Sequence, residues 1–426
     1  MPPRTTLAPV VRAAARPGCS GPAAVEVMRH TLDMGPARAA VICPVLPYPP
    51  VGGGHKRTLR LLEAMERAGV TPQIVTTDGS RPDGAAELRG RGWTVEVVEH
   101  PPVTVRARVR QHLTRRPSPY IPAVAARVRR LVAEGSAFVQ VEHTQSAYYE
   151  RALAGIPWVL SLHNVDSELM RSVAREERTL TLSWLRASSR WRAMRAVERR
   201  AVPRADAVLC VSEADAAAFT PHAREVVVAG NGVDDDFYSV PAEHRGAEQI
   251  LFFGQYDYAP NAQGIARFLG EGWPIVAAAR PAARLRLAGK GMGNALRRLV
   301  ERSERVEAIG FVEDLAAELA ASRLVVVPIW SGGGTRLKVL ESLAAARPVV
   351  GTPLGVVGIG FEGGRHGAVA ETAADLGRAA VELLANHGLA TSLAEEGRRL
   401  ADQFRWTRTM APAERLYQRL ASSSGG

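Results

Sequence analysis

Residues 324–343 read LVVVPIWSGGGTRLKVLESL and contain one complete strand, loop and helix. The β-branched run at 324–328 ends at a proline, and the glycine triplet Gly332-Gly333-Gly334 follows it. From Thr335 onward, apolar residues recur every three or four positions, as on the buried face of a helix. A buried parallel strand that leads through glycines into an amphipathic helix is one unit of an α/β fold.

The same alternation of short strands and amphipathic helices runs through the chain from about residue 38 and forms two blocks. In the first block, strands are predicted at residues 39–44, 73–77, 94–98, 138–142, 158–162, 207–211 and 225–229. In the second block, strands are predicted at 250–253, 285–288, 306–309, 324–328 and 349–351, with helices that start near residues 260, 294, 314, 335 and 372. The predicted fold class is α/β, with two Rossmann-like domains.

A hinge separates the two blocks. Glycine, asparagine and aspartate dominate residues 230–236, and a polar stretch follows Pro241, a composition typical of a linker. The final segment, with Trp406, Met410 and Tyr417, has the pattern of an amphipathic helix that folds back onto the first block. The predicted organisation is a disordered tail at 1–37, domains at 38–244 and 245–405, and a C-terminal helix and tail at 406–426.

The composition is that of a globular protein. Of 426 residues, 46% are apolar and 23% are charged, and no apolar run approaches the roughly 20 residues of a membrane-spanning helix. Cys19, Cys43 and Cys210 are widely spaced, which indicates neither a disulfide framework nor a zinc site. Because Cys43 and Cys210 lie in apolar runs, we expect both to be buried.

The first 37 residues lack the continuous apolar stretch of a secretory signal. We interpret them as a disordered tail of a cytoplasmic protein. A start codon assigned too early, with Met28 or Met34 as the true start, explains them equally well, and a transit peptide is a third interpretation.

Positive charge is concentrated in the first block. The net charge is +11, and residues 101–133 contain eight arginines and no acidic residue. Arginines between residues 171 and 204 are interleaved with tryptophans, a pattern that can bind single-stranded nucleic acid. Four apolar residues of this segment also fit the buried stripe of a helix: Leu180, Trp184, Trp191 and Met194. We favour core packing and expect no nucleic-acid partner; the outward arginines could rest on acidic lipids at the inner face of the cell membrane.

Three glycine-rich turns contain all the lysines of the chain. Of 54 basic residues only Lys56, Lys290 and Lys338 are lysine, and each lies in one of the turns at 49–57, 288–293 and 330–338. Backbone N–H groups of such turns, together with a helix N-terminus, bind anions. Because a compact ammonium is suited to a phosphate, the retained lysines indicate phosphate sites.

The third turn has the strongest signal. Thr335, Arg336 and Lys338 are predicted on the first helical turn, where the helix dipole and two cations favour a pyrophosphate. Glu341, one turn further, could accept hydrogen bonds from a ribose diol. Asp234, Asp235 and Asp236 have the Asp-x-Asp spacing of a manganese site, but their place in the hinge favours a solvated acidic turn, and no metal site is predicted.

Several motifs occur in a fixed order along the chain. They are the glycine loop at 49–54, Leu162-His163-Asn164, Ala205-Asp206-Ala207-Val208, Val211-Ser212-Glu213, Asn231-Gly232-Val233-Asp234, Phe253-Gly254, Pro260-Asn261, the segment 332–341 and Pro348-Val349-Val350. This ordered set resembles the retaining glycosyltransferases of family four. The resemblance covers most of residues 38–410 and implies the GT-B fold, in which two Rossmann-like domains face each other across a cleft.

The resemblance implies an enzyme that moves a sugar from a nucleotide-diphosphate sugar to an acceptor, without a divalent metal and with retention of the anomeric configuration. The second domain would hold the donor, and the first would hold a sugar, lipid-linked or small-molecule acceptor of polysaccharide biosynthesis. The catalytic residues would be His163, Arg336 and Lys338. The donor-binding residues would be Gly53, Gly54, Gly254, Lys290, Gly332, Gly333, Gly334, Thr335 and Glu341. No cofactor is expected besides the donor.

The sequence departs from the family pattern at three positions. Gly333 stands where the family commonly has a glutamate eight residues before the equivalent of Glu341, and Gln255 and Asn261 stand where an arginine and a lysine are frequent. A subgroup of the family shares the glycine triplet. The alternatives are a nucleotide-sugar-binding protein without transferase activity, or another GT-B enzyme such as an epimerase or a phosphorylase.

Overall fold

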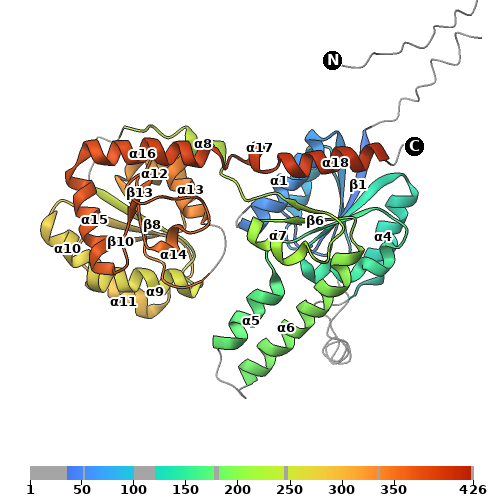
Figure 1. The fold of residues 1–426 in the computed structure, drawn as a ribbon, viewed down its shortest axis with the longest axis horizontal. Coiled ribbons are helices and arrows are strands. Elements are labelled where there is room, and N and C mark those ends of the chain that lie inside the picture. The colour runs from blue at the N-terminus through green and yellow to red at the C-terminus, as the bar shows by residue number, and fades with distance from the viewer. Residues whose placement is uncertain are drawn as a thin grey trace, which may run out of the picture.

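The computed structural model describes residues 36–50, 53–99, 120–176, 182–243, 248–332 and 336–423. Within these ranges the chain forms two α/β domains, each built on one parallel sheet with helices on both faces (Figure 1). The predicted fold class is therefore confirmed. The predicted residues Gly333, Gly334 and Thr335, and most of the arginine-rich stretch between 101 and 133, lie outside the described residues.

The first domain has the strand order β3-β2-β1-β4-β5-β6-β7. Its strands are β1 (Ala37–Cys43), β2 (Val70–Thr76), β3 (Thr94–Val97), β4 (Ser136–Glu142), β5 (Trp158–Ser161), β6 (Ala207–Cys210) and β7 (Val226–Val228). Its helices are α1 (Gly53–Arg67), α2 (Pro82–Gly90), α4 (Pro122–Ala133), η1 (Thr144–Leu153), α5 (Asp166–Glu176), α6 (Leu182–Ala201), η2 (Val202–Arg204) and α7 (Glu213–Phe219).

The second domain has the strand order β10-β9-β8-β11-β12-β13. Its strands are β8 (Gln249–Phe253), β9 (Arg284–Ala288), β10 (Val306–Gly310), β11 (Leu324–Val327), β12 (Val349–Gly351) and β13 (Gly367–Val369). Its helices are α9 (Ala259–Arg267), η3 (Phe268–Gly272), α10 (Trp273–Ala279), α11 (Asn294–Arg302), α12 (Leu315–Ala321), α13 (Leu337–Ala344), α14 (Pro353–Val356), α15 (Ala373–Ala385) and α16 (His387–Asp402). The short helix α8 (Asp235–Tyr238) lies in the linker.

Every predicted strand overlaps an observed one. The strand β13 was missed because its residues, Gly-Ala-Val, lack the β-branched run that marks the equally short strands β7 and β12. Helix α13 begins at Leu337, so the prediction that Arg336 lies on its first turn is wrong: Arg336 occupies the N-cap position. Lys338 lies in the first turn, as predicted.

Alternation along the strands explains the burial on both faces of each sheet. In β1, Ala40 and Ile42 pack on one face, while Ala39, Val41 and Cys43 pack on the other. Side chains of neighbouring residues in a strand point to opposite faces, so a run of five apolar residues is buried only between two layers of helices. Cys43 and Cys210 are free and buried, as expected.

The C-terminal helix belongs to the first domain. After α16, the short helix α17 (Trp406–Thr409) and helix α18 (Ala411–Ser423) carry the chain back across the molecule (Figure 1). Leu416 and Tyr417 of α18 are fully buried in the core of the first sheet. Burial of each such side chain stabilises the fold by roughly 1.5–3 kcal/mol.

The chain therefore crosses between the domains twice, and the two crossings pair with each other. The backbone N–H of Val233 donates to the carbonyl of Phe404 at 2.7 Å, and Val233 forms a parallel bridge with Arg405. A side chain at Gly232 would place its Cβ 2.8 Å from the Cα of Trp406, so glycine is required at this close approach.

Helix α6 does not bury its tryptophans. Its buried positions include Ala187, Val197 and Ala201, whereas Trp184 and Trp191 are half-buried. The interpretation of both tryptophans as core residues is therefore wrong. In the described part of the chain, no helix combines the length and the apolar character that a bilayer crossing requires.

Candidate functional site

The strand order of each sheet reverses at one place, and the glycine loops lie there. In the first sheet the reversal lies between β1 and β4, and in the second between β8 and β11. Ligands of parallel α/β sheets bind at the carboxyl ends of the strands on either side of such a point. The first glycine loop follows β1, Gly254 follows β8 and Gly332 follows β11, so the topology brings the predicted binding loops to both switch points.

The first glycine loop touches both domains. A Cβ at Gly54 would lie 3.5 Å from Nδ1 of His163, and a Cβ at Gly53 would lie 3.4 Å from Cδ1 of Leu337 at the start of α13. The bare backbone of this loop thus lies between the predicted catalytic histidine and the third glycine loop. These contacts bring together residues that the sequence places almost 300 positions apart.

Arg336 and Lys338 supply two cations at the head of α13. Arg336 is 8% exposed, its guanidinium donates to the carbonyl of Gly332 at 3.3 Å, and burial lowers its pKa. Lys338 donates from Nζ to Oδ1 of Asn261 at 2.7 Å. Burial, with a smaller contribution from Arg336, lowers the pKa of Lys338 to about 7, so its charge changes near neutral pH.

Gly254 leaves the space that Lys338 occupies. A Cβ at Gly254 would lie 3.0 Å from Nζ of Lys338 and 2.8 Å from Nδ2 of Asn261. Asn261 stands where the family often has a lysine; here its amide accepts the hydrogen bond from Lys338 and donates to the carbonyl of Gln255 at 2.7 Å. The amide therefore fixes Lys338 beside a backbone without side chains, which is the surface a diphosphate could approach.

Lys56, predicted to bind a phosphate, forms ion pairs with two carboxylates in this structure. Its Nζ lies 3.0 Å from Oδ2 of Asp234 and 3.5 Å from Oε1 of Glu341. Arg60 pairs with the second oxygen of Asp234 at 2.6 Å. The two carboxylates raise the pKa of Lys56 although its burial opposes this, while burial raises the pKa of Glu341. The first residue of the Asp-x-Asp motif thus belongs to an ion-pair network between the domains.

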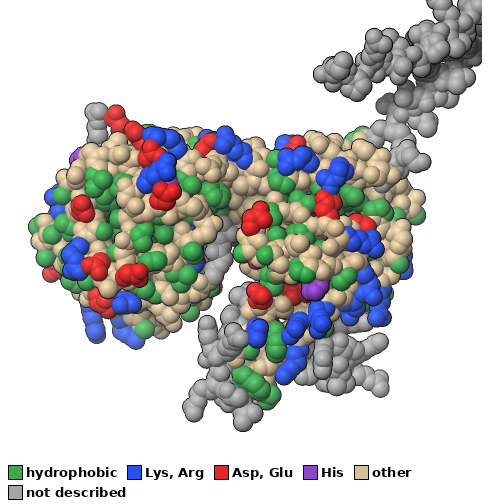
Figure 2. Space-filling model, viewed as in Figure 1, with side chains coloured by type: hydrophobic (Ala, Val, Ile, Leu, Met, Phe, Trp, Pro, Cys, Tyr) green, Lys and Arg blue, Asp and Glu red, His purple; other side chains and the backbone are tan. Residues whose placement is uncertain are grey.

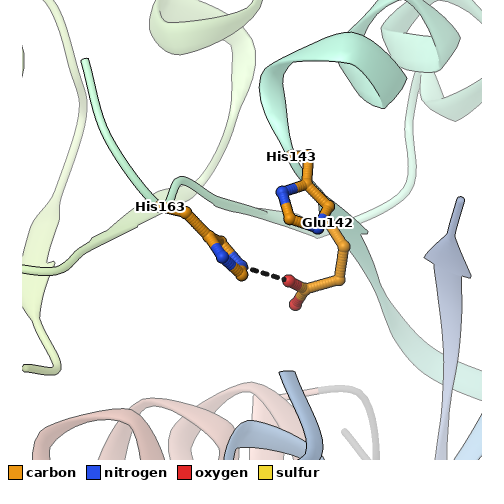
Figure 3. A group of neighbouring side chains, drawn as sticks. All are labelled: Glu142, His143 and His163. Carbon is orange, nitrogen blue, oxygen red and sulfur yellow. Dashed lines mark hydrogen bonds and ion pairs between the residues drawn. The ribbon is translucent and has the colours of Figure 1, made fainter. Parts of the chain in front are cut away.

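His163 is held by a fully buried carboxylate. Its Nε2 lies 3.1 Å from Oε2 of Glu142, at the carboxyl end of β4 (Figure 3). Thr58 donates to the same oxygen at 3.2 Å, and Gln140 donates to Oε1 at 2.6 Å. Burial raises the pKa of Glu142, but these bonds and the neighbouring histidines more than offset it and leave the pKa below its ordinary value. Glu142 is therefore an ionised anchor that orients the imidazole of His163.

The ring of His143 lies beside that of His163, with centroids 4.0 Å apart and ring planes inclined by 40° (Figure 3). Burial and the nearby His163 lower the pKa of His143 to about 4, so it is neutral at physiological pH. The ligand atoms of Glu142, His143 and His163 lie within 4.8 Å of one another and could hold a metal ion. Both oxygens of Glu142 already accept hydrogen bonds, which an ion would have to replace.

Lys290 lines a separate part of the interdomain region. A cavity of about 360 Å³ is bounded by His55 of the first domain and by Gly254, Lys290 and Phe311 of the second. Nζ of Lys290 lies 3.9 Å from the centroid of the Phe311 ring, a distance at which the cation interacts with the aromatic face. The cavity combines an apolar wall with a cation, which suits a planar base attached to phosphates.

Sequence reasoning found the loops but missed several of their partners. Glu142, His143 and Asn261 each hold or flank a predicted residue, and none was predicted to do so. A signal for the first two was present: Glu142 and His143 end a predicted strand that neighbours the strand before His163. Carboxyl ends of adjacent parallel strands meet at one edge, so polar residues there are candidates.

The arrangement suits transfer of a group attached to a diphosphate. One lobe carries two cations and exposed backbone at a helix start, which together stabilise a departing diphosphate. The other domain carries an imidazole that a buried carboxylate orients. The first glycine loop closes the space between them.

Comparisons with known proteins agree with this geometry. The family model described as Glycosyltransferase Family 4 matches residues 51–237, and the model described as Glycosyl transferases group 1 matches residues 247–386. Together they cover more than half of the chain. No curated protein sequence matches it.

Solved structures share the fold over nearly the whole chain. Sucrose-phosphate synthase from Thermosynechococcus elongatus is 19% identical, with a TM-score of 0.65 over 91% of this chain and 100% of its own. Anabaena HepE in complex with UDP and glucose is 17% identical, with a TM-score of 0.62 over 89% of this chain and 99% of its own. WaaG, a glycosyltransferase involved in lipopolysaccharide biosynthesis, is 17% identical, with a TM-score of 0.61 over 88% and 99%.

Because the two family models match successive halves of the chain and the solved glycosyltransferases share its two-domain fold, the chain belongs to the glycosyltransferases of family 4 and has the GT-B fold.

Proposed function

We propose that the protein transfers a sugar from a nucleotide-diphosphate sugar to an acceptor, with retention of the anomeric configuration and without a divalent metal. The second domain binds the donor, with the diphosphate at Arg336 and Lys338 and the ribose at Glu341. The main support is the position of both cations at the N-terminus of α13. There the helix lies close to Gly53 of the first glycine loop and to Gly254 after β8. The fold neighbour HepE was solved in complex with UDP and glucose, which supports this class of donor.

The cations would take the role that a metal plays in other transferases. Negative charge develops on the diphosphate as the glycosidic bond breaks, and preorganised cations stabilise that charge most where water is excluded. In a front-face reaction, the departing phosphate accepts the proton of the acceptor hydroxyl, which attacks from the same side. His163 contacts the transferred sugar, and Glu142 keeps the imidazole in place.

The experiment is a donor panel with nucleotide release as the readout. The protein is incubated with nucleotide-diphosphate sugars, with and without acceptors, and the anomeric configuration of the product is determined by NMR. Arg336→Ala and Lys338→Ala should each lower kcat/KM by about 10²–10³, the effect of removing one stabilising group from a developing charge. Circular dichroism and thermal unfolding should remain close to those of the unaltered protein.

Arg297→Ala is the matched control, since Arg297 is an exposed cation on α11 of the same domain. It should turn over as the unaltered protein does. Full activity in both variants at Arg336 and Lys338 would refute the assignment of the diphosphate site. Nucleotide binding without turnover of any donor would instead favour a binding protein.

A further inference from the structure

A second cavity lies in the first domain, where helices α5 and α6 project from the sheet. It has a volume of about 300 Å³. It is enclosed by α5, α6 and α7, and its lining includes Arg171, Trp191, Arg195, Glu198, Arg199 and His222. Val165, Val202 and Phe219 supply an apolar wall. The volume is at the lower end of ligand pockets and fits a molecule of monosaccharide size.

Within the described residues, Arg171, Arg195 and Arg199 form no ion pair, although Glu168 and Glu198 also line the cavity. The guanidinium groups of Arg171 and Arg195 instead lie 5.9 Å from the ring centroid of Trp191. Figure 2 shows basic side chains gathered over this projecting part of the first domain.

Glu198 gives the cavity a buried carboxyl group. It is 6% exposed, and its Oε1 accepts the backbone N–H of Ser167 at 2.9 Å. Burial and the nearby acidic residues Asp166 and Glu168 raise the pKa of Glu198 to about 7. The hydroxyl of Ser167 also hydrogen-bonds this carboxyl group, so Glu198 is held in place as a polar group in the wall of the cavity.

The cavity adjoins the candidate catalytic histidine. Val165 and Ser167, which line it, follow His163 by two and four residues in the same loop and helix start. Asp166 is the residue between Val165 and Ser167 in the chain, and its carboxyl group contributes to the raised pKa of Glu198. The cavity is therefore in the same domain as His163, the domain opposite the cations of α13.

We propose that this cavity binds the acceptor, and that the acceptor is a sugar carrying a phosphate or a carboxylate. The inference rests on the proposed function and specifies its second substrate. The flat apolar face of a hexose packs on the ring of Trp191, and Glu198 accepts its hydroxyls. The guanidinium groups of Arg195 and Arg199 pair with the anionic substituent, because their planar donors match phosphate and carboxylate oxygens.

Site-resolved labelling of arginines tests this without requiring turnover. The full-length protein is treated with phenylglyoxal, and modification at each arginine is followed by mass spectrometry. The probes are glucose 6-phosphate, fructose 6-phosphate, mannose 6-phosphate and glucuronate, with glucose as the neutral comparison. Arg192 is the internal control: it lies 5.8 Å from the Trp191 ring, as close as Arg195, but does not line the cavity.

At least one charged sugar should slow modification of Arg195 fivefold or more, while glucose should not, and Arg192 should react at the same rate throughout. Protection of neither Arg195 nor Arg199 by any charged sugar would overturn the proposal. Protection by vesicles of phosphatidylglycerol but by no charged sugar would also overturn it, since the ligand would then be a membrane surface.

Kinetics separates this inference from the proposed function. Arg195→Glu should raise the KM of an anionic acceptor at least tenfold and the KM of the donor much less, whereas Arg192→Glu should change neither. Equal changes in both KM values with Arg195→Glu would count against an acceptor site. Absence of nucleotide release by the unaltered protein with every donor defeats the proposed function, but leaves the labelling result to decide what the cavity binds.

Discussion

Lys56 of the first domain reaches Glu341 of the second, with 3.5 Å between Nζ and Oε1, and shares its charge with Asp234 at 3.0 Å. Glu341 is buried and close to Asp234, so its carboxylate depends on Lys56 to remain ionised. An ionised carboxylate accepts ribose hydroxyls more strongly than a neutral acid does. Lys56 of the first domain therefore favours the ionised form of Glu341, the predicted ribose-binding residue of the second domain.

We predict that Lys56→Ala and Glu341→Gln are not additive. Each should raise the KM of the donor, and the double variant should bind little worse than the weaker-binding single variant. The coupling free energy should be about 1 kcal/mol or more, as for side chains in one ion-pair network. A double-mutant cycle on donor KM measures it.

Arg67→Ala is the control for this cycle, because Arg67 lies on the same helix α1 but pairs with Glu414, outside the ion-pair network of Lys56 and Glu341. It should be additive with Glu341→Gln within a few tenths of a kcal/mol. If Lys56→Ala and Glu341→Gln are additive, the contact between Lys56 and Glu341 does not affect donor binding.

Donor binding should weaken as the pH rises above neutrality. Lys338 has a pKa of about 7, because burial and the charge of Arg336 disfavour its ammonium form. Below pH 7 the ammonium is present; above it, binding of the diphosphate requires uptake of a proton. The dissociation constant of a nucleotide sugar should therefore rise by up to about tenfold per pH unit above 7. Calorimetry in buffers of different ionisation enthalpy would also detect the proton uptake.

Lys338→Arg provides the comparison, since a guanidinium stays charged over this range. Its donor affinity should be nearly independent of pH between 6 and 9. An equally steep pH dependence in this variant would assign the titration to another group.

Glu142→Gln should lower kcat without weakening the binding of the donor. The substitution keeps the shape of the side chain but removes the charge that anchors His163 through the 3.1 Å contact. We expect kcat to fall by roughly 10- to 100-fold, as when partners that orient functional histidines are lost. The donor dissociation constant should not change, because Glu142 lies on the domain opposite the cations.

Glu96→Gln, on the edge strand β3, is the matched control and should leave kcat unchanged. A fall in thermal stability large enough to explain the lost activity of Glu142→Gln, or a parallel loss of donor binding, would contradict the anchoring role.

The buried hydroxyl of Tyr417, on the C-terminal helix α18, should contribute to the free energy of unfolding. Tyr417 is fully buried, and its hydroxyl donates at 2.7 Å to Oε1 of Gln140, whose amide holds Glu142. Tyr417→Phe leaves that acceptor unsatisfied and should lower the free energy of unfolding by about 1–3 kcal/mol. Tyr48→Phe is the control, because the hydroxyl of Tyr48 forms no hydrogen bond within the described residues. Denaturant unfolding of both variants measures the difference.

Removal of divalent metal should leave turnover unchanged. Glu142, His143 and His163 have the spacing of a possible metal site, but the Glu142 oxygens already accept bonds, and two cations of α13 are available for the diphosphate. The test is nucleotide release after treatment with EDTA, with the metal content of the protein measured in parallel. Loss of activity that Mn²⁺ or Zn²⁺ restores would contradict the prediction.

Much of the fold could be predicted from sequence because its signals are local. A strand such as β11 is a short apolar run between polar turns, and a helix such as α15 begins at a capping threonine, Thr372. Both depend on neighbours within a few positions. The strand β13 was missed because its sequence Gly-Ala-Val contains a single β-branched residue, whereas the equally short strand β7 is Val-Val-Val.

The sequence by itself determined the two parallel sheets, the glycine loops at their carboxyl ends and the cations of the third loop, because periodicity and turn chemistry are encoded over short spans. Tertiary structure alone decided that Lys56 pairs with Glu341, 285 positions away, that Glu142 anchors His163, and that Trp191 faces arginines instead of the core. Such contacts depend on how the two lobes and their helices pack, and residues far apart in the chain carry no local pattern that specifies their partner.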